Sequence, residues 1–63
     1  MNALNETIYN WFGIQSEVTS MDDVTQSDCE MFADEWNNGE HADQIDADDV
    51  YNIVRGMIED DQF

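Results

Sequence analysis

Apolar residues recur at helical spacing near the start of the chain. They are Leu4, Ile8, Trp11 and Phe12. Positions three and four apart share one face of an α-helix, so the pattern predicts a helix over residues 3–12. Gly13 follows directly, and glycine is common just past the end of a helix. Residues 14–20 lack the stripe, and their β-branched Val18 and Thr19 favour a short extended segment there.

A second apolar stripe lies in the middle of the chain and comprises Cys29, Phe32, Ala33 and Trp36. Its spacing is that of an amphipathic helix. Ser27, followed three residues later by Glu30, fits a capping box and predicts the helix start. Gly39 supplies the stop signal. Ser20 and Asp23 have the same capping spacing, which predicts a short turn that precedes this helix or joins it.

The third stripe is the widest and comprises Ala47, Val50, Tyr51, Val54, Met57 and Ile58. Asp46, followed three residues later by Asp49, fits the N-terminal cap of a helix here. Gly56 lies inside the stripe. Because a glycine within a helix weakens it relative to alanine, we interpret Gly56 as a mark of close packing against another helix.

Together the stripes predict a mainly α fold, in which residues 1–63 form a single domain of three helices around one small core. The expected core residues are Leu4, Ile8, Phe12, Phe32, Trp36, Val50, Val54 and Met57. No apolar run approaches the roughly 20 residues of a membrane span, and no signal peptide is apparent. A single cysteine, Cys29, excludes an intramolecular disulfide and is assigned to the core. We therefore expect a cytoplasmic protein.

The charge of the chain is strongly one-sided. Sixteen residues are Asp or Glu, Arg55 is the single Lys or Arg, and the net charge is −15 at pH 7. A small domain cannot bury unpaired carboxylates, so they must cover the surface. Ordinary solubility needs a net charge of magnitude about 2–8. The excess indicates a surface that binds a basic partner, while the apolar periodicity and the 11% of aromatic residues argue against acidic disorder.

The acids expected to contact that partner lie on the second and third helices and on their connection. They are Glu30, Asp34, Glu35, Glu40, Asp43, Asp46, Asp48, Asp49 and Glu59. On a helical wheel Glu30 and Asp34 share one flank of the second helix, and Glu35 lies on the other. Carboxylates at such spacing are about 5–6 Å apart at Cβ, comparable to phosphates along a DNA strand. Met31 is a candidate apolar anchor among them.

Catalysis and metal binding are not favoured by the sequence. An EF-hand loop starting at Asp43 would place Ile45 at a ligand position. One histidine, His41, and one cysteine cannot build a structural zinc site. No phosphate-binding loop or nucleophile motif is present. We therefore predict a protein that is not an enzyme and that carries no metal or cofactor.

The small size, the net charge of −15 and the absence of lysine resemble phage-encoded DNA mimics. These include inhibitors of restriction enzymes, of uracil-DNA glycosylase and of CRISPR effector complexes, and the chain looks most like the small anti-CRISPR proteins. The resemblance covers the whole chain in composition, and no residue motif carries it. It implies an inhibitor that occupies the basic, PAM-reading surface of a CRISPR effector, here expected to be of type I. Such a protein blocks target DNA without binding nucleic acid itself.

Two further interpretations stay open on the sequence alone. The chain is an acidic adaptor for a basic protein that is not a DNA-processing enzyme, or it is an ordinary domain from a halophile. The salt dependence of folding separates them, because a halophilic domain needs molar salt to fold. A monomer or a weak dimer is expected in every case, since like charges oppose association.

Overall fold

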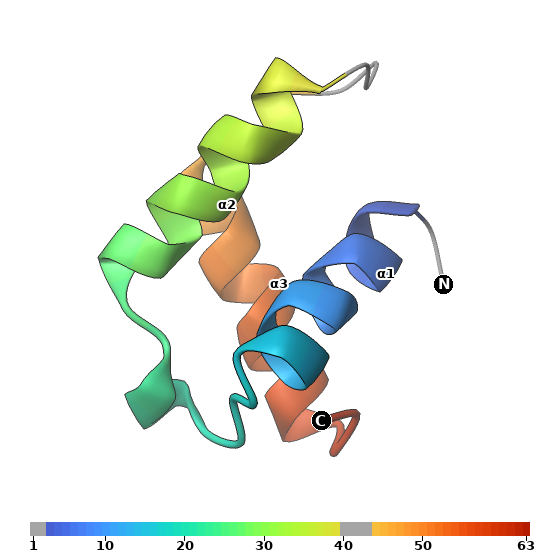
Figure 1. Ribbon diagram of the computed structural model, residues 1–63. Coiled ribbons are helices and arrows are strands. Elements are labelled where there is room, and N and C mark those ends of the chain that lie inside the picture. The colour runs from blue at the N-terminus through green and yellow to red at the C-terminus, as the bar shows by residue number, and fades with distance from the viewer. Residues whose placement is uncertain (1–2, 40–43) are drawn as a thin grey trace.

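The computed structural model describes residues 3–39 and 44–63. Its elements in chain order are α1 (Ala3–Ile8), η1 (Tyr9–Gln15), η2 (Met21–Asp23), α2 (Gln26–Asn38) and α3 (Ala47–Glu59). The described residues contain no strand, so the predicted mainly α fold with three helices is confirmed. Helix α3 is the central element, because it packs against both α2 and α1 (Figure 1).

The first helical segment runs further than predicted. Helix α1 continues into η1, a π-helix that ends at Gln15, and the Ser16 N–H donates to the Trp11 carbonyl at 3.0 Å. This bond joins residues five apart, as π-helical geometry requires. Gly13 therefore does not end the helix. A Cβ added at Gly13 would lie 3.0 Å from Phe63 Cδ1, so the glycine makes room for the Phe63 ring.

The extended segment predicted for residues 14–20 is wrong in two respects. Ile14 and Gln15 belong to η1, and Glu17 has a φ of 53°, in the left-handed region that interrupts any extended run. The physical reason is the burial of Val18, whose N–H donates to the Phe12 carbonyl at 2.8 Å. The chain turns back toward the core at this point instead of running straight.

The start of α2 also differs from the prediction. Thr25, rather than Ser27, is the N-cap, and its Oγ1 accepts a hydrogen bond from the Asp28 N–H at 3.1 Å. Thr25 and Asp28 offer the same three-residue spacing as the predicted capping box, which is why the sequence did not separate the two starts. The end is as predicted, because α2 stops at Asn38 and Gly39 is its C-cap.

The turn predicted before α2 is confirmed as η2, although its contacts differ. Ser20 precedes η2 without a side-chain cap, and the Asp23 carboxylate accepts the Thr19 N–H at 3.4 Å instead. The turn leads directly into Val24, which is buried. This short segment therefore carries the chain from the core edge to the first residue of α2.

The core draws residues from α1, η1, α2 and α3 and from the two connections beside η2. Its buried residues are Ile8, Phe12, Val18, Val24, Cys29, Phe32, Ala33, Trp36, Val50, Val54 and Met57. Every predicted core residue is present except Leu4, which is half-buried and packs against the cluster. Val18 and Val24 were not predicted, because an isolated apolar residue outside a helix has no periodicity to reveal it.

Gly56 does not mark close packing, and this prediction was wrong. No atom lies within 4 Å of a Cβ added there. Gly56→Ala is therefore expected to raise the free energy of unfolding by about 1 kcal/mol, because alanine favours the helix and meets no clash. A urea titration measures this as a higher midpoint at an unchanged m-value. Gly13→Ala is the contrast, since its Cβ must displace Phe63; an equal gain at both glycines would contradict the packing described.

Candidate functional site

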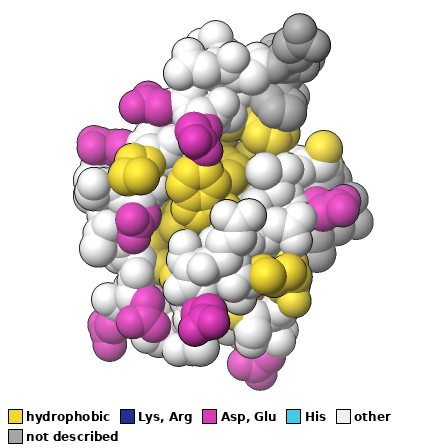
Figure 2. Space-filling view, in the orientation of Figure 1, with side chains coloured by type: hydrophobic (Ala, Val, Ile, Leu, Met, Phe, Trp, Pro, Cys, Tyr) yellow, Lys and Arg dark blue, Asp and Glu magenta, His cyan; other side chains and the backbone are white. Residues whose placement is uncertain are grey.

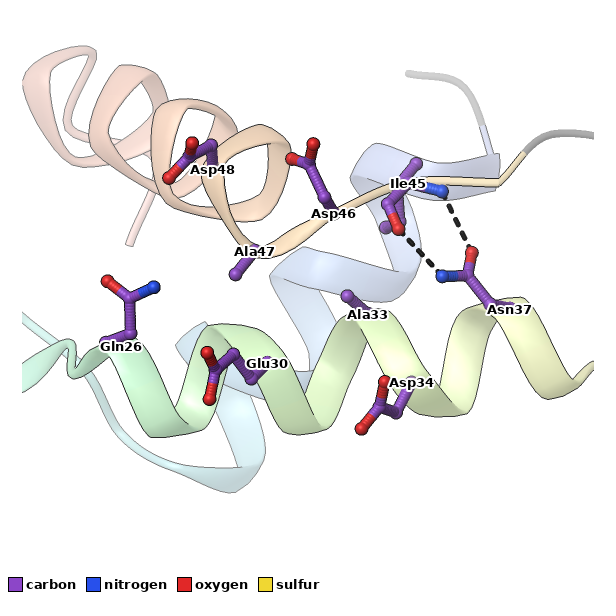
Figure 3. Close-up of a pocket in the computed structure, with 9 residues that line it drawn as sticks. All are labelled: Gln26, Glu30, Ala33, Asp34, Asn37, Ile45, Asp46, Ala47 and Asp48. Carbon is purple, nitrogen blue, oxygen red and sulfur yellow. Dashed lines mark hydrogen bonds between the residues drawn. The ribbon is translucent and has the colours of Figure 1, made fainter.

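An open groove with a volume of about 440 Å³ lies between α2 and the start of α3 (Figure 3). Its lining residues are Gln26, Glu30, Ala33, Asp34, Asn37, Ile45, Asp46, Ala47 and Asp48. Glu30 and Asp34 come from α2, one turn apart, and Asp46 and Asp48 come from the start of α3. We call this feature the acidic groove. It brings together predicted contact residues from two separate parts of the chain.

A side-chain clamp fixes the shape of the acidic groove. Asn37 Nδ2 donates to the Ile45 carbonyl at 2.7 Å, and the Ile45 N–H donates to Asn37 Oδ1 at 2.8 Å (Figure 3). One amide thus satisfies both backbone groups of a residue across the groove. Sequence reasoning missed Asn37, although its position three residues after Asp34 continues the flank that carries Glu30. The clamp holds the entry to α3 against α2.

The first turn of α3 is stabilised by two of its acids. Asp46 Oδ1 accepts the Asp49 N–H at 2.9 Å, and Asp49 Oδ2 accepts the Asp46 N–H at 3.2 Å, so the predicted cap is confirmed as a capping box. The positive end of the helix dipole further favours carboxylates here. Asp48 makes no hydrogen bond or ion pair within the described ranges, so its carboxylate remains available for a partner.

Asp46→Ala removes one half of this capping box, the hydrogen bond that Asp46 Oδ1 accepts from the Asp49 N–H. We expect it to lower the free energy of unfolding by about 1 kcal/mol, which for a domain of this size lowers the melting temperature by about 4–8 °C. Asp46→Asn is the matched control, because asparagine caps nearly as well as aspartate while removing the same charge. Thermal unfolding followed by circular dichroism measures both variants. An equal loss in both would assign the effect to charge and contradict the hydrogen-bonded cap.

Within the described residues, no cation pairs with a carboxylate of the groove. Arg55 is the chain's single Lys or Arg, and its Nε lies 3.3 Å from Glu59 Oε1 on the same exposed face of α3. An exposed pair of this kind contributes little to stability, but it reduces the net charge at Glu59. In the described part of the chain neither Glu30 nor Asp34 has an ion-pair partner. Their negative field therefore reaches solvent uncompensated.

The structure describes three further predicted contact residues, Glu35, Asp49 and Glu59, and none of them lines the acidic groove. Glu59 is near the end of α3, and Glu35 projects from the opposite flank of α2, as the helical wheel predicted. Glu40 and Asp43 lie outside the described residues, so their positions stay a prediction. Met31 is 54% exposed on α2 and remains a candidate apolar contact.

Other chemistries find little support in the described residues. Residues 3–39 and 44–63 contain no group of three or more His, Cys, Asp or Glu side chains placed to hold a metal ion. His41 lies outside these ranges. Burial, and secondarily the charge of Asp28, raises the pKa of the Cys29 thiol, so this group stays protonated at neutral pH and serves the core. None of the described helices has the length and apolar character of a bilayer crossing.

Comparison with known proteins finds no relative of this chain. No family model matches it, and neither the curated proteins nor the solved structures contain a match.

Proposed function

We propose that the protein is a DNA mimic, which inhibits a DNA-binding complex by docking its acidic surface on that complex's basic DNA site. The observation that carries this proposal is charge density. The molecule extends 29 Å along its longest axis and has a net charge of −15. Duplex DNA carries one charge per about 1.7 Å of axis, so a duplex of that 29 Å length carries about 17 charges. The protein thus nearly matches the charge of the DNA length it would replace.

The acidic groove supplies the contacts for such docking. Glu30 and Asp34 on one helix and Asp48 on the other offer carboxylates to Lys and Arg side chains that otherwise bind phosphates. Docking releases counterions from both surfaces, and the long-range field accelerates encounter. Because the clamp and the capping box already fix the groove, little ordering is required when the partner binds. Competition with DNA then needs no chemical step.

As the target we propose a CRISPR effector complex of type I. Such effectors must read a short PAM in duplex DNA through the protein itself, which requires a basic surface open to a competitor. The compositional resemblance to small anti-CRISPR proteins supports this choice. Restriction enzymes and DNA glycosylases also present basic DNA sites, and the same assay tests them.

A competition assay at an ionic strength of about 0.15 M tests this proposal. Labelled duplex is bound to each member of a panel of type I effectors, other CRISPR effectors, restriction enzymes and uracil-DNA glycosylase, and the protein is titrated in. We expect one member to lose its DNA as the protein reaches stoichiometric amounts. Retention of DNA by every member would overturn the proposal.

Folding and binding measurements separate the two alternatives. If the protein is unfolded at about 0.15 M salt and folds only in molar salt, the acidic surface is a halophilic adaptation. If it folds and binds a basic protein without displacing DNA, it is an adaptor. A DNA mimic is expected to fold at physiological salt and to compete with DNA.

A further inference from the structure

A second, smaller depression lies between the N-terminal helical segment and α2, on the flank of α2 opposite the acidic groove. Its lining residues are Thr7, Trp11, Phe32, Glu35 and Trp36, and its volume is about 160 Å³. Sites for whole small-molecule ligands span about 300–1,000 Å³, so this depression has room for a single side chain. Figure 2 shows hydrophobic side chains at the surface between α2 and α1, with Asp and Glu side chains around them. We call the depression the aromatic pocket.

The walls of the aromatic pocket are held by ring contacts. Trp11 meets Phe32 edge to face, with ring centroids 5.3 Å apart, and Phe32 stacks on Trp36 at 6.4 Å. Phe32 is 2% exposed and serves as the fixed support for both indole rings. The Thr7 hydroxyl is already paired, because it donates to the Ala3 carbonyl at 2.7 Å. Trp36 is 7% exposed and Trp11 is half-buried, so the aromatic surface that the pocket offers to a partner comes mainly from Trp11.

Glu35 adds a negative charge to this aromatic surface. It is exposed, and within the described residues it makes no hydrogen bond or ion pair. Glu35 lies in α2, one turn after Met31 and directly before Trp36. An aromatic wall with a carboxylate beside it recognises a planar cation, since the ring face attracts the charge and the carboxylate accepts its N–H groups.

We propose that the aromatic pocket receives an arginine side chain of the basic partner. This inference rests on the proposed function, which supplies a partner surface rich in Arg and Lys. Arginine is preferred over lysine, because the guanidinium is planar, stacks on aromatic rings and bonds a carboxylate through two parallel N–H groups. The pocket then provides the desolvated anchor at which such interfaces concentrate their binding energy.

Other occupants fit less well. A second copy of this chain would bring another net charge of −15 against the same acidic surroundings. An apolar side chain would fill the volume but would remove water from the Glu35 carboxylate without pairing it. An arginine satisfies both the aromatic wall and the charge.

The aromatic pocket also extends the proposed docking surface across α2. The acidic groove lies on one flank of this helix and the aromatic pocket on the other. Met31 is 54% exposed on the same helix. Helix α2 is therefore the element that enters the partner's basic cleft, with a cation bound on each of its flanks.

Peptide binding tests the inference without any knowledge of the partner. Hexa-arginine, hexalysine and hexacitrulline peptides are titrated into the protein labelled with ¹⁵N, at about 0.15 M salt. We expect hexa-arginine to bind about fivefold more tightly than hexalysine and to shift the indole N–H signals of Trp11 and Trp36. Hexacitrulline, which keeps the shape without the charge, is expected not to bind. Equal binding of the arginine and lysine peptides, or unmoved indole signals, would overturn the inference.

A matched pair of variants separates the pocket from the general charge. Glu35→Gln is expected to weaken hexa-arginine binding about fivefold and to abolish the preference over hexalysine. Asp61→Asn removes the same charge elsewhere and preserves the fold, because Asp61 has a φ of 56° and asparagine tolerates that conformation. It is expected to weaken binding less than about twofold. Equal losses in both variants would overturn the inference.

The failure of this inference and the failure of the proposed function give different results. If one DNA-binding complex is inhibited, but Glu35→Gln and Asp61→Asn inhibit it equally, DNA mimicry stands and the arginine pocket does not. If no complex is inhibited, but hexa-arginine binds with the stated preference, the pocket stands with another basic partner. Sedimentation of a dimer that Trp11→Leu dissociates would make a second copy the occupant and overturn the inference.

Discussion

Neutralising three carboxylates of the acidic groove is expected to weaken, about 100-fold, the binding of the protein to the DNA-binding complex that the competition assay identifies. The triple variant Glu30→Gln, Asp34→Asn and Asp48→Asn removes charge while keeping side-chain shape. Close charge pairs at protein interfaces have coupling energies of about 1.5 kcal/mol or more, and three neighbouring pairs add less than fully. The variant is expected to stay folded, because it leaves the Asp46–Asp49 capping box intact and removes the like-charge repulsion one turn apart on α2.

A second triple variant provides the control for net charge. Asp22→Asn, Asp60→Asn and Asp61→Asn make the same change in charge at exposed positions away from the groove. This control is expected to weaken binding less than about tenfold, since exposed and distant charges are screened. Calorimetric titration against the complex found by competition measures both variants. Equal losses would show that total charge, rather than the acidic groove, determines binding.

Phe32→Ala is expected to unfold most of the protein. Phe32 is 2% exposed, and its ring contacts those of Trp11, Phe12 and Trp36. Truncation of a buried phenylalanine costs about 3–5 kcal/mol, whereas a chain near 60 residues is only marginally stable. Far-ultraviolet circular dichroism and a urea titration measure the loss.

Phe32→Leu is the matched control for this core change. Leucine keeps much of the apolar volume, so it is expected to cost less than about 1.5 kcal/mol and to leave a folded protein. A loss below about 1 kcal/mol for Phe32→Ala would contradict the position of this ring at the centre of the core.

Helix α3 shows how far local signals reach. Its wide apolar stripe and the Asp46–Asp49 spacing both predict a helix that begins after Asp46, and the structure has that start and a capping box. At Gly13 the local signal misled, because the glycine serves a contact with Phe63 at the other end of the chain. A glycine that ends a helix and one that admits a distant ring look the same in sequence.

The candidate site was predictable only in part. Helical geometry alone placed Glu30 and Asp34 on one flank of α2 and Glu35 on the other. That the first flank faces the start of α3 depends on the Asn37–Ile45 clamp, which joins two elements through a non-helical segment. No periodicity predicts such a pairing. The aromatic pocket likewise depends on how Trp11 in η1 meets α2, and the sequence did not predict the π-helix that positions it.

Whether protein and DNA exclude each other on the inhibited complex is the most direct test of mimicry. The apparent dissociation constant of labelled duplex from the complex is measured at rising concentrations of free protein and at constant salt. A mimic is predicted to raise that constant linearly and without a limit, because each binds the same basic surface. A plateau, at which protein and DNA occupy the complex together, would contradict DNA mimicry.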